Sequence, residues 1–171
     1  MIFLSYSRLD AQQADMWVEN LERSGYRVWI DRAGIRGGAQ WKATIVRSIQ
    51  EAQAVALLLS PNSARSDNVR RELDLACESR KLIIPVEIQP TRIPPELTYQ
   101  LAGAQILQVW KEPHGGIAFV RAALKAAGAE RGDARIVEAN LGRRSSGEPD
   151  VDLADLGNWS FLSRIAFWRR R

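Results

Sequence analysis

The chain alternates between short apolar runs and longer segments in which apolar residues recur every three or four positions. The apolar runs have the length and composition of β-strands and occupy residues 2–6, 26–30, 54–59, 82–88 and 104–109. The periodic segments each present one apolar face, as amphipathic helices do, and occupy residues 10–23, 41–52, 67–79 and 117–127. A Pro-rich loop, containing Pro90, Pro94 and Pro95, is expected before the last strand.

This order of elements predicts an α/β fold with a parallel sheet and helices on both faces. The run at 54–59 is apolar at every position, which indicates a strand covered on both sides. Five strands fit a flavodoxin-like sheet of order 2-1-3-4-5, in which ligands bind beyond the carboxyl ends of strands 1 and 3. Residues 5–10, 31–41 and 60–72 should therefore converge at that edge.

The alternation ends near residue 128, and the composition of the chain then changes. We expect one domain over residues 1–128, a linker rich in Gly, Ser and Arg over 129–156, and an aromatic, basic segment over 157–171. Two interpretations of the last segment stay open. It is either a short helix that packs on the domain, or a segment that meets a membrane surface or leads into a spanning helix.

Charge and composition exclude several classes of function. The chain has 24 Lys and Arg residues and 20 Asp and Glu residues. Residues 1–130 have nearly balanced charge, with 16 cationic and 14 anionic side chains. A balanced domain argues against a nucleic-acid partner. One His and one Cys cannot build a His/Cys metal site or an internal disulfide, so no metal is expected, and we interpret His114 and Cys77 as structural.

The start of the chain lacks the basic region and long apolar run of a signal peptide. No apolar stretch approaches the roughly 20 residues that span a bilayer. We therefore expect a cytoplasmic protein, with possible membrane-surface contact through residues 159–171.

Familiar phosphate-binding patterns of α/β proteins are missing. The chain contains no Gly-Lys-Ser/Thr triplet, and the turn after the first strand holds no glycine. A phosphoacceptor receiver would need acidic residues after strands 1 and 3, where this chain has Ser5 and Ser60.

Four short sequence motifs are spaced along residues 1–128. They are residues 2–10 (IFLSYSRLD), residues 28–31 (VWID) followed by Gly37, Gly38 and Trp41, residues 57–63 (LLLSPNS) followed by Ser66 and 71–73 (REL), and residues 83–86 (IIPV). In this order they resemble the first strand, the second strand with its BB loop, the third strand with the glutamate-bearing helix, and the fourth strand of bacterial Toll/interleukin-1 receptor (TIR) domains.

The resemblance implies two functions of different classes. Many TIR domains cleave NAD⁺ at the nicotinamide–ribose bond, which implies an NAD⁺ nucleosidase that releases nicotinamide and ADP-ribose or a cyclic variant. Such an enzyme would be activated by self-association, would take NAD⁺ as substrate without any cofactor, and would serve bacterial defence or signalling. Other TIR domains only bind proteins, so the alternative is a non-catalytic interaction module.

The resemblance also assigns roles to individual residues. It places the catalytic carboxylate at Glu72, a dinucleotide contact at Arg8 and a ring-covering aromatic at Trp41. The polar residues Ser7, Ser66 and Asn68 are further candidates for substrate contact. Each has a structural alternative: Glu72 as part of a solvated helix face, Arg8 as the cap of a surface loop, Trp41 as core packing, and Ser66 as a helix cap.

Contacts between subunits are expected from the BB loop, through Asp31, Arg36, Gly37 and Gly38. One position departs from the family pattern: Asn68 stands four residues before the glutamate, where many active bacterial TIR domains have Trp. This departure favours the interaction module and puts cyclisation of the product in doubt. Ser5 and Ser60 are expected only to satisfy the ends of their strands.

Overall fold

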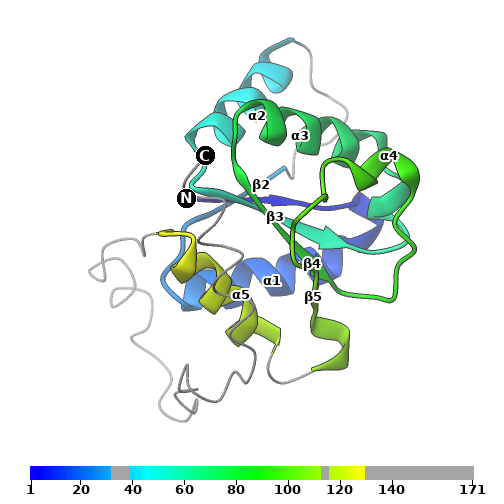
Figure 1. Ribbon diagram of the computed structural model, residues 1–171. Coiled ribbons are helices and arrows are strands. Elements are labelled where there is room, and N and C mark those ends of the chain that lie inside the picture. Colours follow the sequence, from blue (N-terminus) through cyan, green and yellow to red (C-terminus); the bar gives the residue numbers. More distant parts are fainter. Residues whose placement is uncertain (32–38, 113–115, 130–171) are drawn as a thin grey trace.

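Five parallel strands form one sheet through the middle of the molecule (Figure 1). The structure is a computed structural model that describes residues 1–31, 39–112 and 116–129. The strands follow the order β2-β1-β3-β4-β5 that the sequence predicts. Their bounds are Ile2–Ser5 (β1), Val28–Ile30 (β2), Ala54–Leu59 (β3), Leu82–Glu87 (β4) and Leu107–Gln108 (β5).

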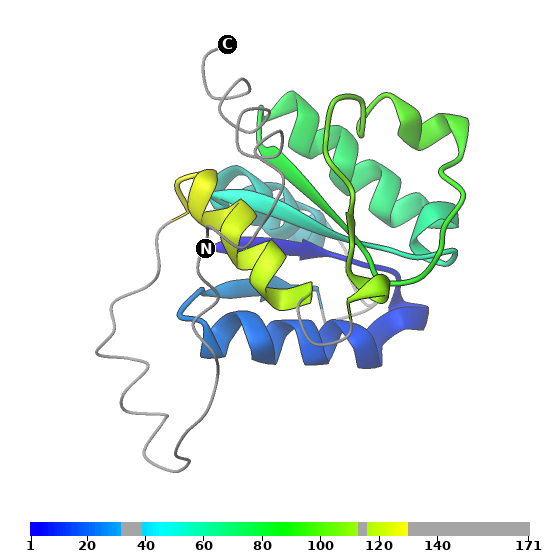
Figure 2. The same ribbon diagram turned by 60° about the horizontal axis from the view of Figure 1, so that its bottom comes forward.

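Helices cover both faces of the sheet (Figures 1 and 2). One face carries α1 (Ala11–Arg23) and α5 (Gly116–Ala126), and the other carries α2 (Ala39–Glu51), α3 (Asp67–Glu78) and the short α4 (Pro95–Thr98). Short 3-10 helices follow three strands: η1 (Arg8–Asp10), η3 (Ser63–Arg65) and η4 (Val109–Lys111). The flavodoxin-like α/β fold is confirmed.

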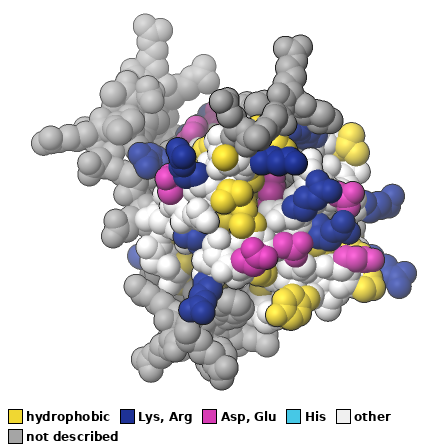
Figure 3. All heavy atoms as spheres, turned by 90° about the horizontal axis from the view of Figure 1, so that it is seen from above, with side chains coloured by type: hydrophobic (Ala, Val, Ile, Leu, Met, Phe, Trp, Pro, Cys, Tyr) yellow, Lys and Arg dark blue, Asp and Glu magenta, His cyan; other side chains and the backbone are white. Residues whose placement is uncertain are grey.

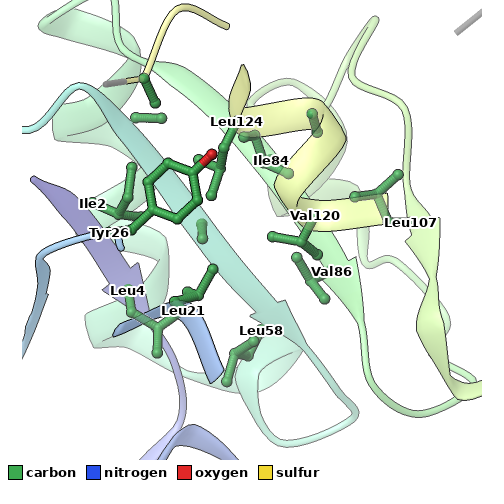
Figure 4. Packing of buried hydrophobic residues seen from close by; sticks show 14 of the residues in the cluster. Ile2, Leu4, Leu21, Tyr26, Leu58, Ile84, Val86, Leu107, Val120 and Leu124 are labelled. Atoms are coloured by element: carbon green, nitrogen blue, oxygen red, sulfur yellow. The ribbon is translucent and has the colours of Figure 1, made fainter. Parts of the chain in front are cut away.

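Successive side chains along each strand point to opposite faces of the sheet and so belong to two separate hydrophobic cores. On β1, Ile2 and Leu4 join the core beneath α1 and α5, whereas Phe3 joins the core beneath α2 and α3. Figure 4 shows the first core, where Val120 of α5 lies near Val86 of β4. Burying one such side chain contributes roughly 1.5–3 kcal/mol, so the two cores fix the edge where β1 and β3 end.

Most predicted elements lie within two residues of the observed ones, and two predictions were wrong. The fifth strand is shorter than the predicted 104–109, because Gly103 at φ 80° and a hydrogen bond from Ala104 N to Leu101 O form a turn there. The predicted Pro-rich loop contains a helix, α4, in which Pro95 takes the first position, where a missing N–H costs nothing.

The described surface carries no extended patch of one charge in the view of Figure 3, where basic and acidic side chains are interspersed. Ala129, the last described residue, is buried and donates its backbone N–H to Leu124 O. The predicted aromatic segment over 157–171 and the linker beyond Ala129 lie outside the described residues, as do Arg36, Gly37, Gly38 and His114.

Candidate active site

The carboxyl ends of β2, β1 and β3 lie side by side, and polar residues follow each of them. The parallel register pairs Ser5 with Leu57 and Leu4 with Ile30, so the three strands end at one edge. Hydrogen bonds join the segments that follow, from Ser5 to α3 and from η1 to the loop after β3. The predicted convergence of residues 5–10, 31–41 and 60–72 is therefore confirmed for its described part.

Glu72 lies at this edge because α3 begins directly beyond β3. Ser66 caps the helix and accepts a hydrogen bond from Val69 N at 3.4 Å. The inward face of α3 is buried as predicted and holds the helix against the sheet, and Glu72, beside Leu73, is half-buried. The Ser5 Oγ, which is fully buried, donates to Glu72 Oε2 at 2.6 Å.

The electrostatics of the site favour a carboxyl group that titrates near neutrality. Burial raises the pKa of Glu72 from its ordinary 4.5 to about 7. The hydrogen bond from Ser5 lowers this pKa, the nearby charge of Asp31 raises it, and the Arg8 guanidinium lowers it. Glu72 is thus not a freely solvated residue of an exposed helix face, and perturbed carboxyl groups of this kind gather at functional sites.

A second cluster, centred on Asp31, lies next to Glu72. Arg8 Nη2 donates to Asp31 Oδ2 at 2.9 Å, and Trp41 Nε1 donates to Asp31 Oδ1 at 3.1 Å. The backbone carbonyl of Asp31 accepts from Tyr6 Oη at 2.9 Å. Asp31 therefore ties the loop after β1 to the first turn of α2, and it holds both side chains that the sequence nominates for dinucleotide contact.

A third cluster joins the buried Asp10, Ser60 and Ser63 to the partly buried Asn62. Asp10, only 1% exposed, accepts from Ser60 Oγ at 2.5 Å and from Asn62 Nδ2 at 2.7 Å. The Ser60 Oγ accepts in turn from the backbone N–H groups of Asn62 and Ser63. This network locks η1 to the loop after β3, and so sets the distance between Arg8 and the start of α3.

The remaining nominated residues surround the site without touching Glu72 in the described contacts. Ser7 is buried and accepts from Leu9 N at 3.4 Å as the cap of η1. Ser66 caps α3, and Asn68 is exposed in the first turn of that helix. The structure thus brings together Arg8, Asp31, Trp41 and Glu72, and it adds Ser5, Asp10 and Ser60. The sequence signal for Ser5 and Ser60 is a polar residue at the end of a buried strand or directly after it, whereas Asp10 lies five residues beyond β1.

Within the described ranges, no group of three or more His, Cys, Asp or Glu side chains is placed to hold a metal ion. None of the helices in the same ranges combines the length and hydrophobicity that crossing a bilayer requires.

A family model described as "TIR domain" matches residues 2–130. The chain belongs to the TIR domain family. A solved TIR domain, that of a Toll-related receptor from Hydra magnipapillata, superimposes with a TM-score of 0.59 at 18% identity, covering 74% of this chain and 96% of that one. The TIR fold is therefore shared with a protein of very different sequence.

Among curated proteins, this TIR domain is similar to a probable 2′ cyclic ADP-D-ribose synthase of Brachypodium distachyon. The two are 29% identical over 94 residues, which is 53% of this chain. The match spans 42% of the plant protein, less than half its length.

Proposed function

We propose that this TIR domain cleaves the bond between nicotinamide and ribose in NAD⁺, with Glu72 as the catalytic carboxylate. The observation that carries the proposal is the Ser5–Glu72 pair at the carboxyl edge of β1 and β3. Membership of the TIR family and the similarity to a probable cyclic ADP-ribose synthase support the same reaction. The products are nicotinamide and ADP-ribose, in linear or cyclic form.

The reaction suits a site with one carboxylate. When the C–N bond breaks, its electron pair goes to the pyridinium nitrogen, so nicotinamide departs neutral and needs no proton. Positive charge develops on the ribose, and an ionised Glu72 beside it stabilises that charge. Water then bonds to the anomeric carbon and loses a proton, or a hydroxyl of the same substrate does so in the cyclic product. The chemistry calls for no metal.

The charge of the substrate acts on the same carboxyl group. With a pKa of about 7, Glu72 is substantially ionised at neutral pH. A pyridinium cation bound next to it favours the ionised form further. Binding of NAD⁺ therefore brings Glu72 to the state in which it acts.

Arg8 and Trp41 supply the dinucleotide contacts in this proposal. A guanidinium suits a pyrophosphate, and an indole suits a planar base. Both side chains hydrogen-bond Asp31 in this structure, so pyrophosphate would compete with the Asp31 carboxylate for Arg8. Ser7, Ser66 and Asn68 are the polar groups proposed to bind the rest of the substrate.

Self-association is part of the proposal, because the loop that begins at Asp31 would contribute to a site shared between neighbouring subunits. Residues Asp31, Arg36, Gly37 and Gly38 are the proposed contacts. The specific rate of NAD⁺ cleavage would then rise with protein concentration. The proposed role in bacterial defence or signalling rests on the resemblance to bacterial TIR domains.

A non-catalytic interaction module is the second candidate, and the exposed Asn68 favours it. Many active bacterial TIR domains have Trp at this position, one turn before the glutamate. NAD⁺ should not raise the melting temperature of a pure interaction module, because it does not bind. NAD⁺ should raise the melting temperature of an enzyme, because it binds the folded state and not the unfolded chain.

The test is release of nicotinamide from NAD⁺ by the full chain, followed by chromatography over a range of protein concentrations. Glu72→Ala is compared with Glu78→Ala, an exposed glutamate later in α3. We expect turnover by the wild type and by Glu78→Ala, and loss of turnover by Glu72→Ala. Equal rates in all three proteins, or no release even at the highest concentration, would sink the enzyme proposal. The same chromatogram separates linear from cyclic ADP-ribose.

A further inference from the structure

Two serine–carboxylate pairs cross between the segments that follow β1 and β3. Ser5, at the end of β1, donates to Glu72 of α3, and Ser60, directly after β3, donates to Asp10 of η1. The first pair belongs to the proposed reaction. The second pair contains a carboxylate that is only 1% exposed and that the proposed reaction does not use. Taking a carboxylate out of water is unfavourable, which makes Asp10 a candidate for a further role at this site.

Asp10 is the anchor of the 3-10 helix η1. Of the three residues of this helix, Leu9 is 80% exposed and the Arg8 side chain is 38% exposed, whereas Asp10 is buried. The Asp10 carboxylate accepts hydrogen bonds on both oxygens, on Oδ2 from Ser60 Oγ and on Oδ1 from Asn62 Nδ2. Both donors belong to the loop after β3. The place of η1 relative to this loop therefore depends on Asp10.

The loop after β3 is held in place by hydrogen bonds of its own. The Ser60 Oγ accepts from the backbone N–H groups of Asn62 at 3.1 Å and Ser63 at 3.0 Å. The buried Ser63 hydroxyl donates to Ser60 O at 3.1 Å and accepts from Ser60 N at 2.8 Å. Because this loop continues directly from the buried strand β3, it gives Asp10 a fixed point of attachment.

The anchoring acts on Arg8, which lies two residues before Asp10 in the same short helix. In this structure the Arg8 guanidinium is also held by Asp31, at 2.9 Å. In the proposed reaction pyrophosphate takes the guanidinium from Asp31, so this link is lost when the substrate binds. Among the described contacts, the side-chain hydrogen bonds that still join η1 to segments distant in sequence are those of Asp10.

We propose that Asp10 is a positioning residue, which holds Arg8 where it meets the pyrophosphate of NAD⁺. This role rests on the proposed function. Helix α3 keeps its own attachments, through Ser5 and through its buried face, when Asp10 is removed. Loss of Asp10 should therefore weaken binding of the dinucleotide and leave the chemical step at Glu72 nearly unchanged.

The experiment compares initial rates of nicotinamide release by the full chain, with circular dichroism to establish that each variant is folded. Asp10→Ala should raise KM for NAD⁺ by about tenfold and change kcat by less than about threefold, because a displaced guanidinium weakens binding and not the chemical step. Glu22→Ala, at an exposed position of α1, is the control and should leave both values unchanged. In Arg8→Ala, the further loss of Asp10 should raise KM by less than about twofold, since the group that it positions is gone.

Exchanging the two partners tests the pairing itself. Asn62→Asp alone places two carboxylates together and should raise KM about as much as Asp10→Ala does. Combining Asp10→Asn with Asn62→Asp restores one carboxylate and one amide, so KM should return to within about threefold of the wild-type value. These two variants also test the proposal if Asp10→Ala does not fold.

Affinity for ADP-ribose, measured by calorimetry, gives a readout that needs no turnover and should fall by about tenfold in Asp10→Ala. With an active wild type, three results would overturn the role of Asp10. They are an unchanged KM in Asp10→Ala, an equally large effect of Asp10→Ala in the Arg8→Ala background, and no recovery in the exchanged pair. A wild type that neither releases nicotinamide nor binds ADP-ribose would instead overturn the proposed function, and this role with it.

Discussion

Two carboxyl groups lie near the carboxyl ends of the neighbouring strands β3 and β4, and their surroundings differ. Glu87, at the end of β4, is 5% exposed and accepts on both oxygens, from Thr91 N at 3.0 Å and from Trp110 Nε1 at 2.8 Å. Glu72, beyond β3, is more exposed, and among the described residues Ser5 is its single hydrogen-bond donor. The fold thus uses the acceptors of Glu87 and leaves those of Glu72 largely free.

The difference teaches which carboxylate serves structure and which is available for chemistry. Glu87 accepts hydrogen bonds from neutral donors on both of its oxygens. It thereby joins the loop after β4 to η4. A carboxylate with free acceptor capacity, an elevated pKa and partial exposure is costly to the fold and is retained where a substrate uses it. We therefore expect substitutions at the two positions to act on different quantities.

The largest expected effect is on catalysis. Glu72→Gln keeps the shape of the side chain and an acceptor for Ser5 but removes the charge, so kcat for NAD⁺ cleavage should fall by about 10²–10³-fold. Glu87→Gln should change kcat by no more than about threefold, since its contacts are structural. Initial rates of nicotinamide release check both values, and a comparable loss in the two variants would remove the distinction between the two carboxylates.

The next effect is on stability and belongs to Glu87. Glu87→Ala leaves the part-buried donors Trp110 Nε1 and Thr91 N without their acceptor, and a hydrogen bond to a charged group contributes about 1.5–3 kcal/mol. We expect the free energy of unfolding to fall by about 2–4 kcal/mol in urea titrations. Glu96→Ala, at an exposed position of α4, is the control and should change it by less than about 0.5 kcal/mol.

The third effect is the pH dependence of stability that Glu72 contributes. The pKa of Glu72 is higher in the folded protein than in the unfolded chain, so the folded state binds the proton more tightly. The free energy of unfolding therefore falls as pH rises from about 4.5 to about 7. Glu72→Gln removes this loss. Relative to the wild type, the variant should therefore be more stable at pH 8 than at pH 4 by about 1–3 kcal/mol. Parallel unfolding curves with no such difference would show that Glu72 is not desolvated.

The smallest effect concerns Ser5, which acts through Glu72 as a positioning residue. Its hydrogen bond lowers the pKa of Glu72, so Ser5→Ala should move the midpoint of the pH–rate profile to higher pH. The rate at pH 7 should fall by about three- to tenfold, because the bond contributes about 1 kcal/mol. Ser5→Thr, which keeps a hydroxyl, should restore the midpoint. An unchanged midpoint in Ser5→Ala would assign Ser5 to packing alone.

The sequence predicted those features of the fold that depend on local periodicity. Val69, Leu73 and Ala76 recur at helical spacing, and all three are buried on α3. The continuous apolar run from Ala54 to Leu59 became a strand buried on both faces. Strand order followed from the alternation of elements and the usual handedness of their connections. The start of β5 and helix α4 were mispredicted because a turn at Gly103 and the helix start at Pro95 depend on neighbouring structure.

The sequence predicted which residues belong to the site but not which of them contact one another. Resemblance nominated Glu72, Arg8 and Trp41, whereas their partners are far away in sequence: Ser5 is 67 positions from Glu72, and Asp31 is 23 from Arg8. Such pairs depend on the register of parallel strands, which apolar runs alone do not determine. Ser5 was interpreted as a strand-end residue for this reason, although it is the donor that holds Glu72.

The most direct test of the central claim is the pH dependence of kcat/KM for nicotinamide release, measured for the wild type and Glu72→Gln side by side. This profile reports the essential groups of the free enzyme. The account predicts that the wild-type value rises about tenfold per pH unit at acid pH and levels off above about pH 7, whereas the Gln variant stays low and flat. Profiles of the same height and shape in the two proteins would contradict it.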